Sequence, residues 1–314
     1  MGAELALFAQ SGPPTLSQIL SSPGWIWTGI TSVLVLAVFF GMQYFTQMGV
    51  IARATAKEAI RQPIFILLLL FGIFFLVLVT FLPFFSLGSD LKMMKDCGLM
   101  HILISCLLLA VWTSSTSIAN EIEGKTAMTL LSKPVNRRQF IVGKLMGIVN
   151  AVFALWLPLS IMFLMLVFYK TIYESRESGE SMELRMRFLL TFQMVPGLIL
   201  ILLESIVMAS ISVAISTRLP MFVNMVVCLV IFILGQLTPI LVEQSAFKIE
   251  FVQFIAQWLA TIIPSLESFN VQTAIQRDRL VPPEYLGWIA LYSFLYSSVA
   301  MLFAFILFED RDLA

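Results

Sequence analysis

The chain has 314 residues, of which 59% are hydrophobic and 12% charged, and its formal net charge is zero. Soluble domains contain about 45–50% apolar and about 25% charged residues, so this composition and a mean hydropathy of +0.95 exclude an ordinary soluble domain. Because only helices and closed barrels satisfy their backbone polar groups inside a bilayer, and the apolar runs are long rather than alternating, we predict an all-α integral membrane protein.

Residues with catalytic or metal-binding chemistry are few. The chain has three cysteines, Cys97, Cys106 and Cys228, and one histidine, His101. The cysteines lie in or beside apolar runs without the spacing of a disulfide framework or a metal site, and a single histidine offers little to a catalytic site. We therefore expect a chain that is not an enzyme and holds no metal. Its surroundings should be a lipid bilayer, and we expect no nucleic-acid partner.

Seven apolar stretches reach the length of about 20 residues that crosses a bilayer. They are Trp25–Val50, Ile64–Phe85, Leu99–Ile118, Phe140–Tyr169, Phe188–Thr217, Met221–Val242 and Tyr285–Phe308. The polar stretches 86–98 and 169–187 are predicted to be solvated connections. The first span is too long for the apolar region of a cleaved signal peptide and lacks its basic start.

Basic residues set the predicted orientation. The short loops after the first and third spans carry most of the Lys and Arg expected on the cytoplasmic side, where such residues accumulate beside span ends. With seven spans, the N-terminus would lie outside and the C-terminus in the cytoplasm. We divide the chain into an N-terminal tail and helix, residues 1–52, and a core, residues 53–314.

A basic, helix-prone segment separates the first two spans. Its sequence, "ARATAKEAIRQP", carries the basic residues Arg53, Lys57 and Arg61. These three residues either anchor the chain at the membrane surface or belong to a helix with a further role.

Residues 120–144 form the most informative loop. Gly124-Lys125-Thr126 matches the end of a phosphate-binding loop, but that motif needs a glycine five residues before Gly124, after a buried strand. Ala119 stands there, at the end of a predicted membrane helix. We interpret the match as chance and the loop as a short amphipathic element, either an ordinary charged loop or a docking element for another protein.

The fifth span carries two further features. Glu204 lies deep within an uncharged stretch, where an ionisable group indicates function by default; it could form a structural hydrogen bond between helices, or line a cavity or gate. Small residues recur on one face of the same helix, where another helix could pack within the chain or across a dimer. They are Ser205, Ala209, Ser212 and Ser216. Pro196 and Gly197 predict a kink in this span.

The segment 246–283 precedes the last span. Its apolar residues Phe251, Ile255, Trp258, Leu259 and Ile262 fall on one helix face. The pattern predicts an element in the outer membrane interface, either a cap over a pathway or a lipid-facing helix.

Residues 121–144 resemble the signature between the second and third core helices of ABC-2-type transporter permeases. The matching positions are Glu121, Glu123, Thr126, Leu130, Leu131, Ser132, Pro134, Val135, Arg137, Arg138, Gly143 and Lys144. "PSLESFNV" (264–271), the C-terminal "FEDRDLA" and the basic segment before the second span are also similar to this family. The subgroup that the chain most resembles includes the permease of nitrous-oxide-reductase maturation systems.

The resemblance implies a six-helix permease core preceded by one extra membrane helix, in the inner (plasma) membrane. It implies a second permease subunit, identical or different, and two ABC ATPase subunits that bind the ATP and magnesium. The expected ATPase-coupling residues are Glu121, Glu123, Lys125, Thr126, Arg137, Arg138 and Lys144. Arg53, Lys57 and Arg61 would lie on the connecting helix before the core. In the family, the segment corresponding to 246–283 often caps the pathway.

The implied function is ATP-driven transport, with export as the expected direction. A membrane subunit that passes ATPase motion to a periplasmic or surface assembly would use the same parts. A secondary transporter would show inverted repeats with broken helices in matching positions, and the sequence shows no clear repeat and one deep carboxylate, Glu204.

Overall fold

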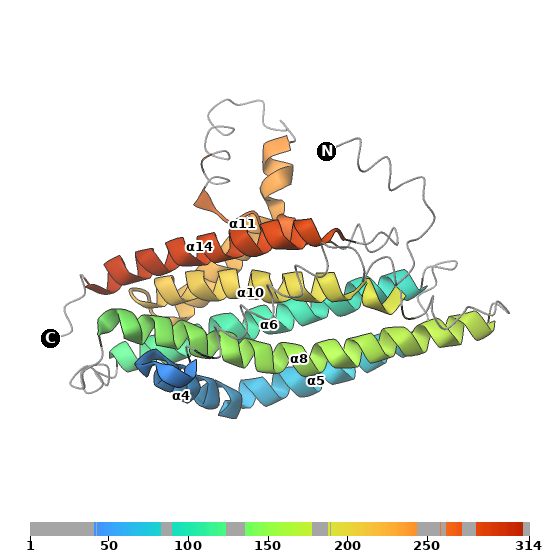
Figure 1. Ribbon diagram of the computed structural model, residues 1–314, viewed down its shortest axis with the longest axis horizontal. Helices are drawn as coiled ribbons and strands as arrows, with labels where there is room; N and C mark the ends of the chain where they lie inside the picture. Colours follow the sequence, from blue (N-terminus) through green and yellow to red (C-terminus); the bar gives the residue numbers. More distant parts are fainter. Residues whose placement is uncertain are drawn as a thin grey trace.

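The structure, a computed structural model, describes residues 41, 43–82, 90–123, 136–177, 188, 190–243, 258, 262–271 and 281–309. Within these ranges the longer elements are helices (Figure 1). They are α4 (Gln47–Arg61), α5 (Pro63–Phe81), α6 (Asp90–Glu123), α8 (Arg137–Glu177), α10 (Val195–Ser216), α11 (Met221–Glu243), the 3-10 helix η1 (Leu266–Phe269) and α14 (Pro283–Glu309).

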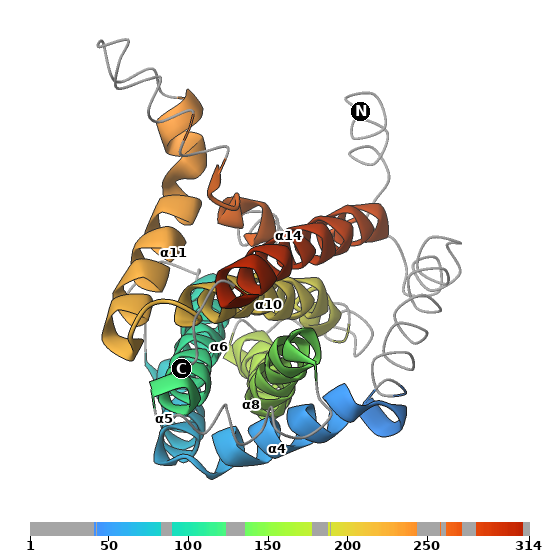
Figure 2. The same cartoon turned by 90° about the vertical axis from the view of Figure 1, so that its left-hand side faces the viewer.

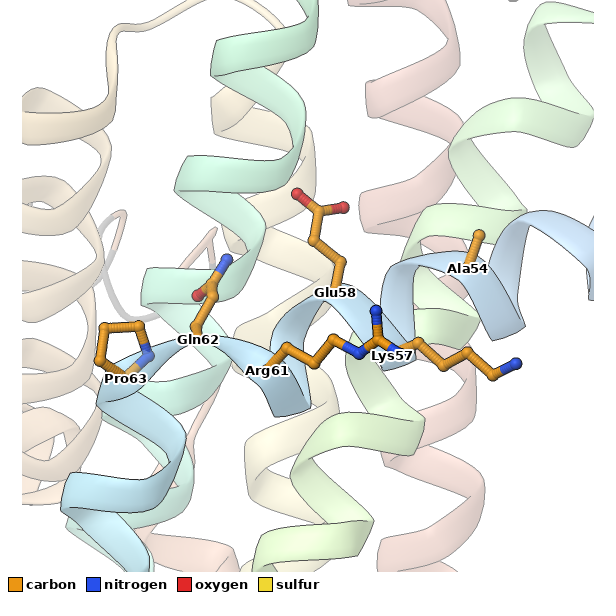
Figure 3. Close-up of a pocket in the computed structure, with 6 residues that line it drawn as sticks. All are labelled: Ala54, Lys57, Glu58, Arg61, Gln62 and Pro63. Atoms are coloured by element: carbon orange, nitrogen blue, oxygen red, sulfur yellow. The ribbon is translucent and has the colours of Figure 1, made fainter.

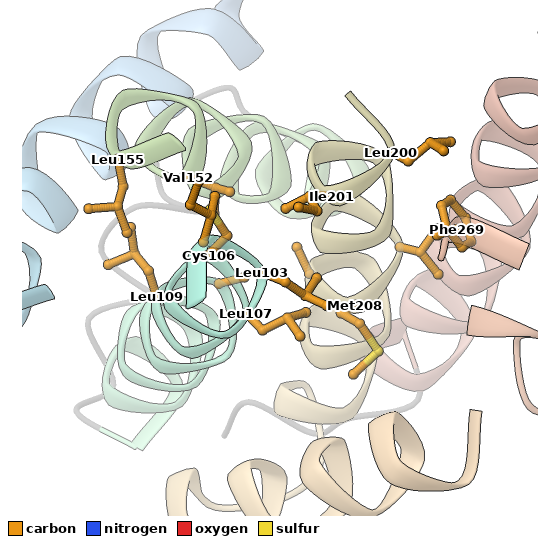
Figure 4. Close-up of a cluster of buried hydrophobic side chains, with 14 of the residues drawn as sticks. Leu103, Cys106, Leu107, Leu109, Val152, Leu155, Leu200, Ile201, Met208 and Phe269 are labelled. Atoms are coloured by element: carbon orange, nitrogen blue, oxygen red, sulfur yellow. The ribbon is translucent and has the colours of Figure 1, made fainter. Parts of the chain in front are cut away.

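Helices α6 and α10 form the centre of a bundle. In their most apolar windows 67% and 72% of residues are buried, against 33% in α5 and 28% in α14. Leu103 and Cys106 of α6 contribute to an apolar core with Val152 of α8 and with Ile201 and Met208 of α10 (Figure 4). The outer helices therefore leave much of their apolar surface for lipid or a further subunit.

Five described helical stretches are long and apolar enough to cross a membrane. They are Pro63–Phe81, Asp90–Ile118, Arg138–Glu174, Leu190–Ser216 and Pro283–Phe308. These correspond to the second, third, fourth, fifth and seventh predicted spans. The sixth corresponds to α11, whose described apolar part, Met221–Leu237, is shorter. The first, Trp25–Val50, lies largely outside the described residues, as does most of the segment 246–283.

Two predicted features differ from the structure. Residues 90–98 and 169–177, expected to be solvated connections, continue α6 and α8 as helix, because a helix need not end where its apolar stretch ends. Pro196 does not kink a continuous helix. It lies in the first turn of α10, after a turn at Gln193 and Met194, where a missing backbone N–H leaves no intrahelical hydrogen bond unmade.

Helix α4 lies across one end of the bundle, beside the start of α8 and the last described residues of α6 (Figures 1 and 2). We call this end of the bundle the α4 end. The α4 face toward α8 consists of small residues, including Ala52, Thr55 and Ala56. Gly147 of α8 faces them: a Cβ there would lie 2.6 Å from the Thr55 Cβ and 2.7 Å from the Ala52 carbonyl oxygen, while one on Gly143 would lie 2.9 Å from the Met48 carbonyl oxygen. The two backbones therefore meet without intervening side chains, as in small-xxx-small helix pairs.

Gly147→Ala should destabilise the chain by about 1–3 kcal/mol, since the added methyl group overpacks the α4–α8 crossing. Thermal melting of the detergent-purified chain measures the effect. Gly287→Ala is the matched control, because a Cβ there meets no atom within 4 Å. Equal melting temperatures for the two variants would contradict a tight crossing.

Candidate functional site

The α4 end gathers the ends of the expected coupling segment. Glu121 and Glu123 lie in the last turn of α6, and Arg137 and Arg138 in the first turn of α8. Asn136 precedes α8, and its backbone N–H donates to Oε1 of Gln139 over 3.3 Å, the return half of a capping box. Arg138 is exposed. Lys125 and Thr126, with residues 124–135 as a whole, lie outside the described residues.

The start of α8 carries charge that opposes its own helix dipole. The amino end of a helix carries partial positive charge, which favours negative charge nearby, and α8 starts with two arginines and no acidic residue in its first turn. These arginines therefore do not stabilise α8, and their charge is suited to contacts elsewhere. Two acidic residues, Glu121 and Glu123, are among the last described residues of α6.

Lys144, one of the expected ATPase-coupling residues, lies inside the bundle. Only 3% of it is exposed, and its Nζ donates to Oγ of Ser117 on α6 over 2.8 Å. The ammonium group also lies 5.7 Å from the centre of the Phe140 ring. Lys144, the last residue of the expected coupling segment, thus joins α8 to α6.

The basic residues Arg53, Lys57 and Arg61 of α4 share its exposed face. The guanidinium of Arg53 lies 5.4 Å from the Tyr44 ring, and its Nε donates to the Gly49 carbonyl oxygen over 3.3 Å. Lys57 and Arg61 are exposed and line a shallow groove of about 530 Å³ at the elbow between α4 and α5 (Figure 3). The three cations therefore lie on the side of α4 that does not pack on α8.

The small-residue face of α10 packs within the chain. Ser205, Ala209, Ser212 and Ser216 are all buried. The Ser212 hydroxyl contacts that of Ser114 on α6, and Ser216 donates to the Ser212 carbonyl oxygen over 2.8 Å. The face therefore holds α6 and α11 close to α10.

Asn224 of α11 is the polar centre of this contact, and it is not among the site residues predicted from the sequence. Its Nδ2 lies 2.7 Å from the Ser115 hydroxyl, 2.9 Å from that of Ser212 and 2.7 Å from that of Ser216. The Cys228 thiol donates to its Oδ1 over 3.3 Å. An asparagine within the apolar run "MFVNMVVC" was the available signal, because a polar side chain in a membrane helix needs partners on its neighbours.

Glu204 forms a hydrogen bond between helices. It is buried, and Nε2 of Gln236 on α11 donates to its Oε1 over 2.8 Å. Gly235, next to Gln236, packs against the segment 262–271: a Cβ there would lie 2.8 Å from Leu266 Cγ. The acid therefore lies close to the described part of the expected cap.

Three tyrosines of α14 hold that segment. The Tyr285 hydroxyl donates to the Ser268 carbonyl oxygen over 2.6 Å, and that of Tyr296 to the Ile262 carbonyl oxygen over 2.9 Å. The Tyr292 hydroxyl accepts from the backbone N–H of Ser265 over 3.1 Å. These bonds satisfy backbone groups of an irregular segment packed on apolar helices, as a low-dielectric environment requires.

Five helices able to cross a membrane, joined by buried polar contacts and carrying a charged α4 end, define a multi-pass helical membrane protein. A family model described as ABC-2 family transporter protein matches residues 25–313, and the chain belongs to this family. Members are membrane subunits that are generally not themselves catalytic and generally work with an ABC ATPase. A search of curated proteins finds no match to the chain.

Lys144→Met should lower stability by about 1–3 kcal/mol, because the Ser117 hydroxyl loses its buried donor. The measurement is thermal melting of the chain in the absence of any partner. Arg138→Met, at an exposed position one and a half turns earlier, is the control and should leave melting unchanged. A melting temperature unaffected by Lys144→Met would mean that Lys144 does not join α8 to α6.

Gln236→Leu should destabilise the chain more than Glu204→Gln. The first change leaves the Glu204 carboxyl group buried without its donor, while the second keeps an oxygen that can accept from Gln236. Interhelical hydrogen bonds in membrane proteins contribute about 0.6 kcal/mol on average and up to about 1.7, so the difference should fall in that range. A double-mutant cycle monitored by melting measures it, and a coupling of zero would contradict the contact.

Proposed function

We propose that the chain is the permease subunit of an ABC transporter, and that the α4 end faces the cytoplasm and receives the motion of a separate ABC ATPase. The observation that carries the proposal is the match of residues 25–313 to the ABC-2 family, whose members generally work with an ABC ATPase. The charges at the α4 end support it: the arginines at the amino end of α8 are unfavourable in isolation, and two acidic residues are among the last described residues of α6. A charged partner surface would compensate both.

The contacts around that end support transmission of motion. Lys144 and Ser117 join α8 to α6, so a force on the segment 124–135 would reach both helices together. Helix α4 packs on α8 through the Gly143 and Gly147 crossing, and Gln43, which precedes α4, donates to Asn150 of α8 over 3.0 Å. Helices α4, α6 and α8 would therefore move as one unit.

The proposed assembly is the one expected for an ABC-2 family permease. Two copies of the ATPase bind ATP and magnesium and close on two permease subunits, identical or different, in the plasma membrane. The N-terminus is outside, the C-terminus is cytoplasmic and the direction is export. The likeness of residues 121–144 extends the proposal to the subgroup that includes the nitrous-oxide-reductase maturation permease.

Removing the negative charges near the α4 end tests the proposal. Replacing Glu121 and Glu123 together by glutamine should weaken binding of the ABC ATPase that co-purifies with the chain from its native membrane. Exposed ion pairs contribute about 0.2–1 kcal/mol each, so two predict roughly a two- to thirtyfold loss of affinity. ATP hydrolysis by the complex should also lose its response to the permease.

Glu284→Gln is the matched control, since Glu284 is an exposed acid in the first turn of α14. It should change neither binding nor hydrolysis. If no ABC ATPase co-purifies and activity persists without ATP, the proposal fails. If ATPase binding is intact in the wild type but no substrate crosses reconstituted vesicles, the chain transmits ATPase motion to another assembly instead of transporting.

A further inference from the structure

The elbow between α4 and α5 has features of a ligand site that the proposed function does not use. The groove of about 530 Å³ is lined by Ala54, Lys57, Glu58, Arg61, Gln62 and Pro63 (Figure 3). Lys57 and Arg61 are one helical turn apart, where two like charges destabilise a helix by a few tenths of a kcal/mol. An anion bound between them would remove this repulsion.

The direction of the groove distinguishes possible occupants. Helix α4 packs sideways on α8, so its exposed face looks away from the bundle, and Figure 2 shows it at the periphery when the bundle is viewed from the α4 end. In Figure 3 the Lys57 and Arg61 side chains extend along this outer surface, while Glu58 is directed away from them. A partner positioned beyond the ends of α6 and α8 would not face these two cations.

The groove also lies where the polar part of the chain meets its apolar part. Helix α5 begins at Pro63 and has no charged residue through Phe81. Ile66, Leu67 and Leu70, in its first two turns, are 52%, 62% and 62% exposed. A cationic groove at the end of α4 therefore lies directly before an exposed apolar stripe on α5, which matches a molecule with an anionic head and an apolar tail.

We propose that the elbow binds an anionic phospholipid, with its phosphate between Lys57 and Arg61 and an acyl chain along Ile66, Leu67 and Leu70. Basic residues near a membrane surface attract anionic lipids, and their long side chains reach the headgroup level. Arg53 contributes less, because its guanidinium is already engaged by Tyr44 and the Gly49 carbonyl oxygen. The bound lipid would fix α4 at the membrane surface.

Native mass spectrometry of the full chain tests the proposal, comparing phosphatidylglycerol with phosphatidylcholine of the same acyl chains. The wild type should retain phosphatidylglycerol preferentially. At about 1 kcal/mol per basic residue, K57Q should reduce this preference about fivefold and K57Q/R61Q about thirtyfold. The charge-retaining variant K57R/R61K should keep most of it, and E58Q should increase it.

Two controls distinguish a lipid site at the elbow from general attraction of anions to the chain. K92Q removes an exposed lysine near the start of α6 and should leave the preference unchanged. Excess inorganic phosphate should not displace the lipid, because it offers no acyl chain to α5. An equal loss in K92Q, or full displacement by phosphate, would overturn the proposal.

A further outcome would also overturn it. If K57Q/R61Q kept its lipid preference but lost the co-purifying ATPase, the groove would be a protein-docking surface instead. Because lipid retention is measured on the chain alone, a negative result there leaves the ATPase-coupling proposal standing, and failure of ATPase coupling leaves the lipid site standing.

Discussion

A polar group inside an apolar bundle must find its partner within the protein, and this constraint organises the centre of the fold. Asn224 of α11 meets hydroxyl groups from both α6 and α10, so its position fixes how these three helices lie against one another. Helix α8 is then tied to α6 by a second buried polar contact, from Lys144 to Ser117, and α4 is tied to α8 by a glycine crossing. These contacts hold the charged α4 end in place against the membrane-spanning helices.

The sequence predicted the helical spans well where apolar runs alone define them, and less well where a polar helix continues beyond one. Residues 90–98 read as a loop because they are charged, yet they extend α6. Glycine and lysine in "GKLMG" were interpreted as a family signature and an interfacial charge. The spacing of Gly143 and Gly147 was the more informative feature, since it allows α4 to approach. The burial of Lys144 depends on Ser117, 27 residues away, which no local pattern reveals.

In the candidate site, too, the sequence indicates which residues share a helix face but not which element that face contacts. Helical spacing placed the small residues of α10 on one face, and the structure places Arg53, Lys57 and Arg61 together on the exposed face of α4. What each face meets is decided by tertiary packing. The α10 face meets α6 and α11 of the same chain, whereas the α4 face is directed to the periphery because the opposite face is taken by α8. Tertiary packing therefore decides that the α10 face is buried and the α4 face is exposed.

Asn224 offers two amide hydrogens to three hydroxyl oxygens, so at any moment the three contacts share two protons. Ser212 and Ser216 lie one turn apart on α10, and each can accept while the other donates elsewhere. Any two of the three contacts use both amide hydrogens, so the amide is satisfied whichever pair is made. The junction therefore tolerates the rotation of a single hydroxyl group without leaving a bare polar group between the helices.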